Sequence, residues 1–277
     1  MMEESMSIPF VKMHGTGNDF ILFDNRNRNL NDEQITSLSK KICQRRFGAG
    51  SDGFIALQFD ETKEADLVMV FKNPDGSDAG MCGNGARCFG GFAVTLGAPQ
   101  TFTFRVHQNI YKAVVRDHNA LITFPLQTKV TELILEGEPL LSVYTNTEHI
   151  VCSTVQTELN NIQMLSEKGR RYRFHEQFEP KGTNVNFIYG LGKNRVSLQT
   201  YERGVENLTY SCGTGAIASA LGWHHLQQAG GGSYQYQIEV QGGTLTVHFS
   251  FQEETSLYEN ILLEGPYSFV YEGFFYV

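Results

Sequence analysis

The sequence predicts an α+β fold of two pseudo-symmetric domains related by duplication, each a mixed β-sheet or barrel wrapped around a central buried helix. Three observations predict it: many short segments in which apolar and polar residues alternate, few helical stretches, and a cysteine-glycine motif that occurs twice. A chain of 277 residues is also long enough for two hydrophobic cores of ordinary size.

Alternation of apolar and polar residues is typical of half-buried strands. It recurs at 65–71, 101–107, 111–115, 120–124, 196–201 and 237–249. Within the last segment, Gly242-Gly243 predicts a hairpin turn. The stretch Gly48–Gly53 has the spacing of a dinucleotide-binding loop, but it leads into strand-like residues rather than a helix, so we interpret it as a turn.

Three segments predict helices. Residues 31–45 begin with Asn31 as a capping residue and carry an apolar stripe, which indicates an amphipathic surface helix. Residues 83–96 and 213–226 are apolar on nearly every side, as expected of helices buried inside a sheet. We expect a surface or capping role for His224 and His225, rather than metal binding, near the end of the third helix.

The two buried helices each follow a cysteine in an internal repeat. Cys82-Gly83-Asn84-Gly85-Ala86 in the first half corresponds to Cys212-Gly213-Thr214-Gly215-Ala216 in the second. Asn73 and Arg203 precede the two motifs by the same interval. A duplicated domain explains this pattern. We place the first domain at residues 1–126, with 265–277 returning to it, the second at 127–264, and the active site in the cleft between them.

The repeated motif predicts acid-base chemistry at Cys82 and Cys212. A cysteine at a helix N-terminus has a pKa lowered from about 8.5 toward neutrality, so it can accept a proton. The glycines and exposed N–H groups that follow form a carboxylate site. Two such sites facing each other would let one thiolate remove an α-proton while the other thiol delivers one to the opposite face. The sequence therefore predicts a racemase or epimerase without a cofactor, and the remaining cysteines serve as small hydrophobic residues.

Composition excludes several other classes of protein. The net charge of -8 and the scattered Lys and Arg residues argue against nucleic acid as a partner. No apolar run approaches the roughly 20 residues that span a bilayer, so we expect no membrane association. Five cysteines without a dense framework fit a reducing compartment, and none has the spacing of a metal site. We expect a cytoplasmic homodimer that binds a small amino acid and holds no metal.

Several segments carry a resemblance to a known family. They are His14-Gly15-Thr16-Gly17-Asn18-Asp19-Phe20, Asn73-Pro74-Asp75-Gly76-Ser77, Met81–Cys88, Gly182–Phe187, Glu202-Arg203-Gly204-Val205, Ser211–Gly215 and Leu263-Glu264-Gly265-Pro266. Together they resemble diaminopimelate epimerases, within a wider group that includes proline racemases and phenazine-pathway isomerases. Proline racemases typically carry His where Asn84 stands and lack the motif at 14–20, so the epimerases are the closer match.

The resemblance implies conversion of LL-diaminopimelate to meso-diaminopimelate, which serves lysine and peptidoglycan precursor synthesis. Cys82 and Cys212 would be the acid-base pair. Substrate-binding roles are implied for Gly83, Asn84, Gly213 and Thr214 at the reacting carboxylate and for Asn18, Asn73, Asn184, Glu202 and Arg203 at the distal end. His149 and Glu202 would adjust the pKa of the cysteines.

The sequence departs from the family pattern in two places. Thr147 stands where a substrate-binding Asn is expected, and Asn207-Leu208-Thr209 replaces a more acidic loop. These departures bear on which amino acid is bound. The alternatives are therefore a racemase of another amino acid such as a proline derivative, a non-catalytic amino-acid-binding protein, and a thiol redox protein. Alanine variants of the two cysteines would separate an enzyme from a binder.

Overall fold

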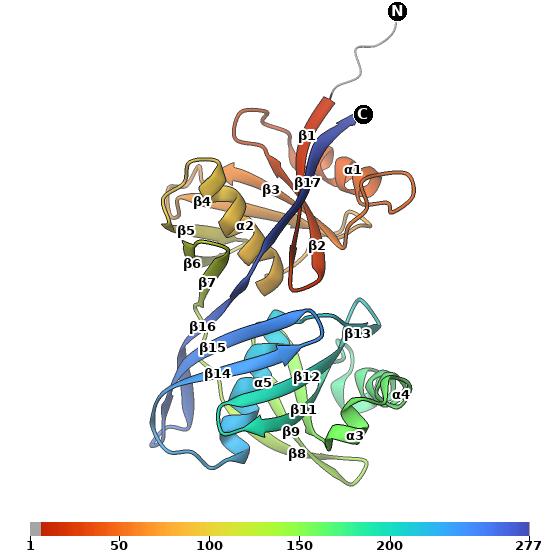
Figure 1. Ribbon diagram of the computed structural model, residues 1–277, viewed down its shortest axis with the longest axis vertical. Helices are drawn as coiled ribbons and strands as arrows, with labels where there is room; N and C mark the ends of the chain where they lie inside the picture. Colours follow the sequence, from red (N-terminus) through yellow and green to blue (C-terminus); the bar gives the residue numbers. More distant parts are fainter. Residues whose placement is uncertain (1–6, 277) are drawn as a thin grey trace, which may run out of the picture. The chain divides into compact units, whose positions relative to one another are not determined.

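The computed structural model describes residues 7–276 (Figure 1). They form two compact units: one comprises the described residues up to Ile122 together with those from Pro266 onward, and the other is Thr123–Gly265. Strands dominate both units and each holds one buried helix, so the expected α+β class is confirmed. Within the described residues there is no helix with the length and apolarity to span a membrane.

The first unit is built around helix α2. Its elements are β1 (Ser7–Gly15), β2 (Asn18–Asp24), α1 (Asp32–Ile42), β3 (Gly53–Phe59), β4 (Leu67–Lys72), α2 (Gly83–Thr95), β5 (Thr101–Val106), β6 (Asn109–Arg116), β7 (Asn119–Phe124) and β17 (Ser268–Tyr276). β1 pairs antiparallel with both β2 and β17, so the last strand of the chain joins the first. The pairing continues from β2 to β3 in parallel, and from β3 to β4 antiparallel.

The second unit is built in the same way around helix α5. Its elements are β8 (Val130–Leu135), β9 (Glu138–Tyr144), β10 (Glu148–Ser153), α3 (Gln156–Leu159), α4 (Ile162–Arg173), a 3₁₀ turn (Glu176–Phe178), β11 (Asn184–Gly192), β12 (Arg195–Glu202), β13 (Asn207–Thr209), α5 (Gly213–Leu226), β14 (Gly232–Val240), β15 (Gly243–Gln252) and β16 (Leu257–Pro266). β10 pairs in parallel with β11, and β11 pairs antiparallel with β12.

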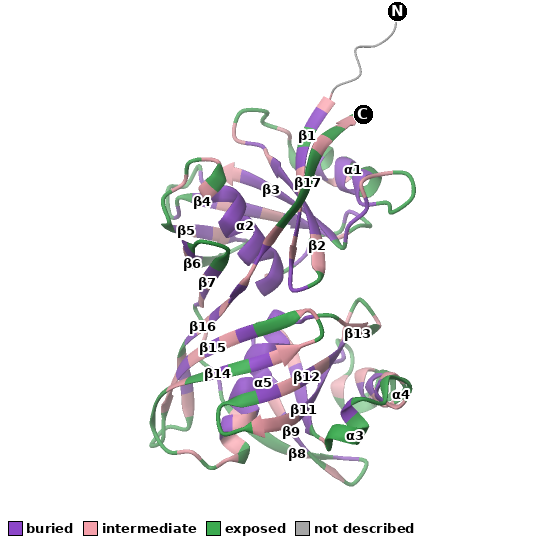
Figure 2. Cartoon of the chain, viewed as in Figure 1, coloured by how far each residue is buried: buried purple, intermediate pink, exposed green. Residues whose placement is uncertain are grey.

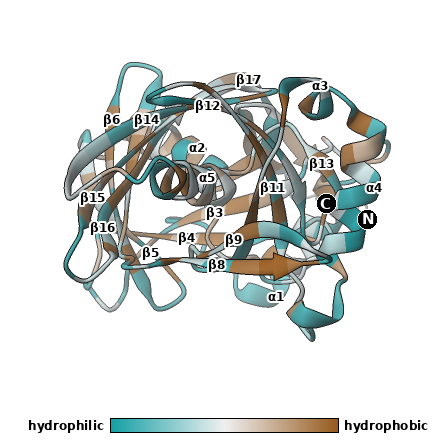
Figure 3. Ribbon diagram, turned by 90° about the horizontal axis from the view of Figure 1, so that it is seen from below, coloured by the Kyte–Doolittle hydropathy of each residue, from teal (hydrophilic) through white to brown (hydrophobic). Residues whose placement is uncertain are grey.

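Both buried helices begin where the sequence predicts. α2 and α5 start at the glycine after each cysteine, and nearly all their residues before the last turn are buried (Figure 2). α2 packs on β3 and α5 packs on β11, two strands that are hydrophobic along much of their length (Figure 3). Each helix is therefore surrounded by apolar surface, which explains why its sequence has no polar stripe.

Two further expectations have clear outcomes. The hairpin near residue 242 is confirmed, since Val240 pairs with Gly243 across a two-residue turn.

The surface or capping role expected for His224 is wrong. Its side chain is buried among the aromatic rings of β14, β15 and β16, and Nδ1 lies 2.9 Å from the hydroxyl of Tyr258. Burial lowers the pKa of His224 to about 4, so the ring is neutral in the folded protein at neutral pH.

Candidate active site

Cys82 and Cys212 occupy equivalent positions at the starts of α2 and α5. Both have extended backbone angles, with φ -115° and ψ 118° for Cys82 and φ -126° and ψ 112° for Cys212. The N–H of Gly85 donates to Sγ of Cys82 at 3.5 Å, and the N–H of Gly215 donates to Sγ of Cys212 at 3.4 Å. Each sulfur thus caps its helix, and the helix dipole and this N–H both favour a thiolate.

Cys82 lies beside two of the predicted substrate-binding residues. Oδ1 of Asn18 accepts a hydrogen bond from the Cys82 thiol at 3.8 Å and another from Nδ2 of Asn84 at 3.2 Å. Oδ1 of Asn84 in turn accepts from Nη2 of Arg87 at 3.0 Å. Arg87 is fully buried, and burial lowers the pKa of its guanidinium to about 10, so it remains a cation at neutral pH. The structure therefore brings Asn18 and Asn84 to the Cys82 thiol.

Asn73 makes different contacts from Asn18 and Asn84, the other two predicted substrate-binding asparagines of the first unit. Its side-chain amide donates to the hydroxyl of Ser77 at 3.0 Å, and the N–H of Gly76 donates to its carbonyl at 2.9 Å. These bonds close the tight turn that follows β4, with Gly76 in the left-handed region at φ 84°. In this structure the Asn73 amide contributes to a turn rather than to the group around Cys82.

Cys212 begins helix α5, which packs against β10, β11 and β12. The hydroxyl of Thr214 lies 3.6 Å from Sγ of Cys212. A Cβ atom added at Gly215 would lie only 2.5 Å from Oδ1 of Asn186, so the start of α5 approaches β11 as closely as a glycine allows. Asn186 is fixed there, because the hydroxyl of Thr200 donates to the same Oδ1 at 3.0 Å. Sequence reasoning missed the positioning roles of Asn186 and Thr200.

His149 lies against Asn186 in the interior of the same unit. Nδ2 of Asn186 is 3.0 Å from Nδ1 of His149. Since the amide can only donate there, Nδ1 accepts and the ring proton resides on Nε2. Burial, and secondarily the charge of Arg203, lower the pKa of His149 to about 3, so the ring is neutral at neutral pH. Nε2 is buried and has no hydrogen-bond partner among residues 7–276, which leaves one oriented N–H donor.

Arg203 is the centre of a second polar cluster in this unit. Its backbone N–H donates to Oδ1 of Asn184 at 2.9 Å, and Nδ2 of Asn184 donates to the carbonyl of Glu148 at 2.9 Å. The guanidinium donates to Oε2 of Glu148 at 3.0 Å and to the hydroxyl of Thr147 at 2.6 Å. Thr147 is therefore a direct partner of Arg203, and Glu148 is a charged partner that sequence reasoning missed. Glu202, the residue before Arg203, ends β12.

The other three cysteines have different surroundings. All five cysteines are free thiols, and Cys43, Cys88 and Cys152 are buried in apolar interiors. Burial raises the pKa of Cys43 to about 11 and that of Cys152 to about 12, and it raises the pKa of Cys88 still further. None of the three begins a helix, so they are poor proton acceptors, in agreement with the structural role expected for them.

The fold recurs in solved structures of a phenazine biosynthesis protein and of an epimerase. A phenazine biosynthesis protein of the PhzF family from Bacillus anthracis superposes with a TM-score of 0.74 at 12% identity, over 98% of this chain and 100% of the other. A hydroxyproline epimerase from Agrobacterium vitis, solved with bound trans-4-hydroxy-L-proline, superposes with a TM-score of 0.73 at 15% identity, over 100% of this chain and 94% of the other.

Sequence comparison makes the relation more specific. The family model described as diaminopimelate epimerase matches residues 10–125 and 141–270. The fold and this match define an amino-acid isomerase of the epimerase class. The diaminopimelate epimerase of Flavobacterium psychrophilum is 37% identical over 94% of this chain and 97% of its own length. That of Aquifex aeolicus is 37% identical over 76% and 80%. The chain belongs to the diaminopimelate epimerase family.

Proposed function

We propose that this chain converts LL-diaminopimelate to meso-diaminopimelate, without a cofactor, by proton transfer between Cys82 and Cys212. The observation that carries the proposal is the equivalence of the two thiols. One in each unit caps the first turn of a buried helix with nearly the same backbone angles and the same N–H···S contact. Duplication of a structural helix start would require the glycines, but it would not require a cysteine twice.

The reaction needs one thiolate and one thiol. The thiolate takes the α-proton from one face of the substrate, and the electron pair of the broken C–H bond moves into the α-carboxylate. N–H groups in the first helical turns, at Gly83 and Asn84 of one unit and Gly213 and Thr214 of the other, would stabilise that developing charge. The opposite thiol then protonates the α-carbon from the other face. The configuration is inverted, and the two sulfurs have exchanged protonation states.

The distal end of diaminopimelate carries a second ammonium and a second carboxylate. Asn18, Asn184, Glu202 and Arg203 would supply the amides, the carboxylate and the planar guanidinium that such a group requires, and Asn73 would join them by exchanging its turn contact with Ser77 for the substrate. The neutral His149 ring carries a buried proton on Nε2. By donating a hydrogen bond, it would adjust the pKa of Cys212. The Thr147 hydroxyl, which accepts from Arg203, bears on how the distal carboxylate is held.

We further propose that the two units act as two domains, 1–126 with 265–277 and 127–264, with the substrate bound in a cleft between them.

In this proposal the protein works in the cytoplasm as a homodimer and supplies meso-diaminopimelate for lysine and peptidoglycan precursor synthesis. Exposed apolar and aromatic side chains on β17, namely Phe269, Val270, Tyr271, Phe274 and Tyr276, support association of two copies. Light scattering across a concentration series tests the dimer, which a constant monomer mass would exclude.

Deuterium exchange tests the proposed reaction directly. Reduced protein incubated with LL- or meso-diaminopimelate in deuterated water should incorporate deuterium at the α-carbon and invert it. Cys82→Ala and Cys212→Ala should each abolish inversion, while the matched control Cys43→Ala, at a thiol outside the site, should retain it. Folded, reduced protein that shows neither exchange nor inversion would refute the assignment.

The same assay separates the remaining alternatives. Inversion of proline or hydroxyproline, but not of diaminopimelate, would identify a racemase of a proline derivative. An amino-acid-binding protein would bind diaminopimelate equally well in both alanine variants and show no turnover in any of them. A thiol redox protein would gain activity when Cys82 and Cys212 are joined in a disulfide, whereas the proposed epimerase loses its activity on oxidation because no thiolate remains.

A further inference from the structure

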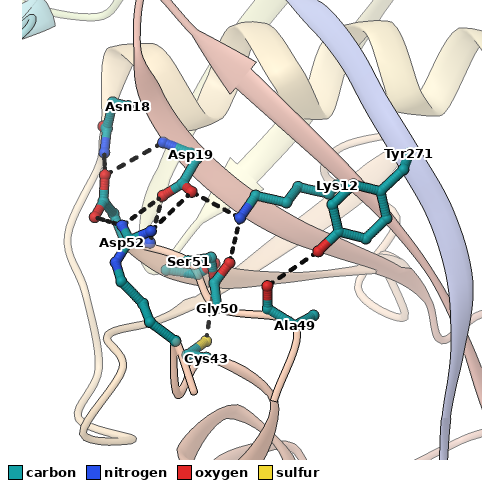
Figure 4. Close-up of polar contacts among 11 residues, drawn as sticks. Lys12, Asn18, Asp19, Cys43, Ala49, Gly50, Ser51, Asp52 and Tyr271 are labelled. Carbon is teal, nitrogen blue, oxygen red and sulfur yellow. Dashed lines mark hydrogen bonds and ion pairs between the residues drawn. The ribbon is translucent and has the colours of Figure 1, made fainter. Parts of the chain in front are cut away.

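The orientation of the Asn18 amide is fixed from both of its ends. On one side Oδ1 accepts from the Cys82 thiol and from Nδ2 of Asn84. On the other side Nδ2 donates to Oδ2 of Asp52 at 2.8 Å (Figure 4). An asparagine amide can rotate to exchange its oxygen and nitrogen, so an acceptor on the Nδ2 side decides which end faces the sulfur.

Asp52 is itself held by neighbouring charges. Nη2 of Arg45 donates to Oδ1 of Asp52 at 2.7 Å and to Oδ1 of Asp19 at 3.1 Å. The N–H of Asp52 donates to Oδ1 of Asp19 at 2.9 Å. Asp19 is anchored by Nζ of Lys12, which lies 2.8 Å from Oδ2. Figure 4 shows Lys12, Asp19 and Asp52 in a continuous series of contacts that ends at Asn18.

The charges in this series are stable around neutral pH. Burial raises the pKa of Asp19, but the hydrogen bonds from Lys12 and Arg45 lower it by more, so the net pKa lies below the usual value and Asp19 is an anion. The same interaction with Asp19 raises the pKa of Arg45, which stays a cation. One anion and one cation of fixed charge therefore position the Asp52 carboxylate.

The arrangement has a consequence for the Cys82 sulfur. Rotation of the Asn18 amide would point its Nδ2 hydrogens at Nδ2 of Asn84, a second donor whose own orientation is fixed by Arg87. It would also replace the acceptor at Cys82 by a donor. With Oδ1 toward the sulfur, the protonated thiol has an acceptor, and a thiolate would lose that bond. The orientation thus favours the thiol form of Cys82, the form that delivers a proton.

We propose that Asp52 is a positioning residue for the epimerisation: with Arg45 it holds the Asn18 amide oxygen toward Cys82 and so stabilises the protonated thiol. This inference rests on the proposed function. The side chain of Asp52 is 44% exposed and that of its partner Arg45 is 60% exposed. Exposed ion pairs contribute little to stability, so the loss of Asp52 should alter the site without unfolding the protein.

Steady-state kinetics provide the first test. Asp52→Ala should lower kcat/KM for LL-diaminopimelate about tenfold, the usual effect of losing one hydrogen bond to a charged group. Asp66→Ala is the matched control, because Asp66 is an exposed carboxylate of the same unit that accepts from the N–H and hydroxyl of Thr103 instead. The control should keep wild-type kinetics, and both variants should unfold at similar temperatures.

Alkylation of Cys82 gives a readout that a merely structural role would not change. Its rate, followed by peptide mass spectrometry against pH in the full chain, rises as the thiolate forms. Asp52→Ala should lower the pH midpoint of this rise, since the thiol loses its fixed acceptor. In the Asn18→Ala background the same substitution should cause no further shift. An equal shift in both backgrounds would mean that Asp52 acts through its charge alone and would overturn the proposal.

The Asn18→Ala and Asp52→Ala variants distinguish failure of the proposed function from failure of the positioning role. If Asn18→Ala leaves turnover unchanged, the proposed site around Cys82 is wrong and the role of Asp52 is wrong with it. If Asn18→Ala reduces turnover but Asp52→Ala has neither a kinetic effect nor an effect on alkylation, the proposed function stands and only the positioning role is overturned.

Discussion

Replacing Glu148 by glutamine removes a negative charge from the partner of Arg203 while keeping an oxygen that accepts its hydrogen bond. The carboxylate of Glu148 lies 3.0 Å from Nη1 of Arg203, and Lys181 lies 3.7 Å from its other oxygen. If Arg203 binds the distal carboxylate of the substrate, that carboxylate must share the guanidinium with Glu148. The variant Glu148→Gln should therefore bind the substrate more tightly.

The size of the effect follows from the distance between the two carboxylates. Two anions that share one guanidinium lie about 5 Å apart, where Coulomb's law gives about 0.8 kcal/mol of repulsion in water and about 3 kcal/mol at an effective dielectric constant of 20. The side chain of Glu148 is 38% exposed, so an intermediate value of about 1–2 kcal/mol is appropriate. KM should fall about five- to thirtyfold with kcat unchanged, because the gain applies equally to substrate and transition state.

Initial rates measured at low and high salt test this reasoning. The difference between Glu148→Gln and wild type should shrink as salt screens the charges. Glu167→Gln is the matched control, since Glu167 is an exposed helical carboxylate that accepts from Gln163, and this variant should leave KM unchanged. An unchanged or increased KM in Glu148→Gln would show that the carboxylate orients Arg203 rather than competing with the substrate, and would refute the argument.

Three further predictions concern the second unit. Thr147→Asn keeps an acceptor for Arg203 and adds a donor, so KM for diaminopimelate should fall several-fold in steady-state assays; a rise would mean the hydroxyl is preferred. Gly215→Ala places a Cβ 2.5 Å from Oδ1 of Asn186, so denaturant unfolding should show a loss of about 1–3 kcal/mol, and activity should drop as the start of α5 shifts. For His224 the pKa of about 4 in the folded state is below its unfolded value of about 6.5, so the unfolded chain binds more protons between these values and stability falls as pH decreases through that window. His224→Phe should reduce this slope in pH-dependent unfolding and leave turnover intact, and an unaltered slope would exclude His224 as its source.

The parts of the site that the sequence predicts are local in the chain. Cys82 and Cys212 are followed by glycines and then by apolar residues on nearly every face, so both the helix start and its burial can be predicted from a few neighbouring positions. The structure confirms α2 and α5 at these positions. Local signals of this kind are independent of how distant strands pair.

The parts that the sequence does not predict depend on contacts between distant segments. Asn18 meets Asp52 because β2 pairs in parallel with β3, with Phe20 opposite Gly53, and no local pattern specifies that register. His224 follows Trp223 near a helix end rich in polar residues, which suggests exposure. The aromatic residues that bury it come from three later strands, so tertiary packing overrides the local pattern.

Duplication explains the backbone of the two helix starts, but it does not make their chemistry equal. At the second position of α2, Asn84 bonds to Asn18 and to the buried cation Arg87. The corresponding Thr214 of α5 offers a hydroxyl near Cys212, and Ile217 stands where Arg87 would be.

Cys82 therefore has an oriented amide oxygen as an acceptor, whereas Cys212 has a hydroxyl that can donate or accept. An acceptor stabilises a thiol, so the Asn18 oxygen biases Cys82 toward the protonated form, whereas the Thr214 hydroxyl can serve either form of Cys212. Such a bias would make one direction of epimerisation start from the more populated protonation state, and it would arise from side chains that diverged after the duplication rather than from the repeated fold.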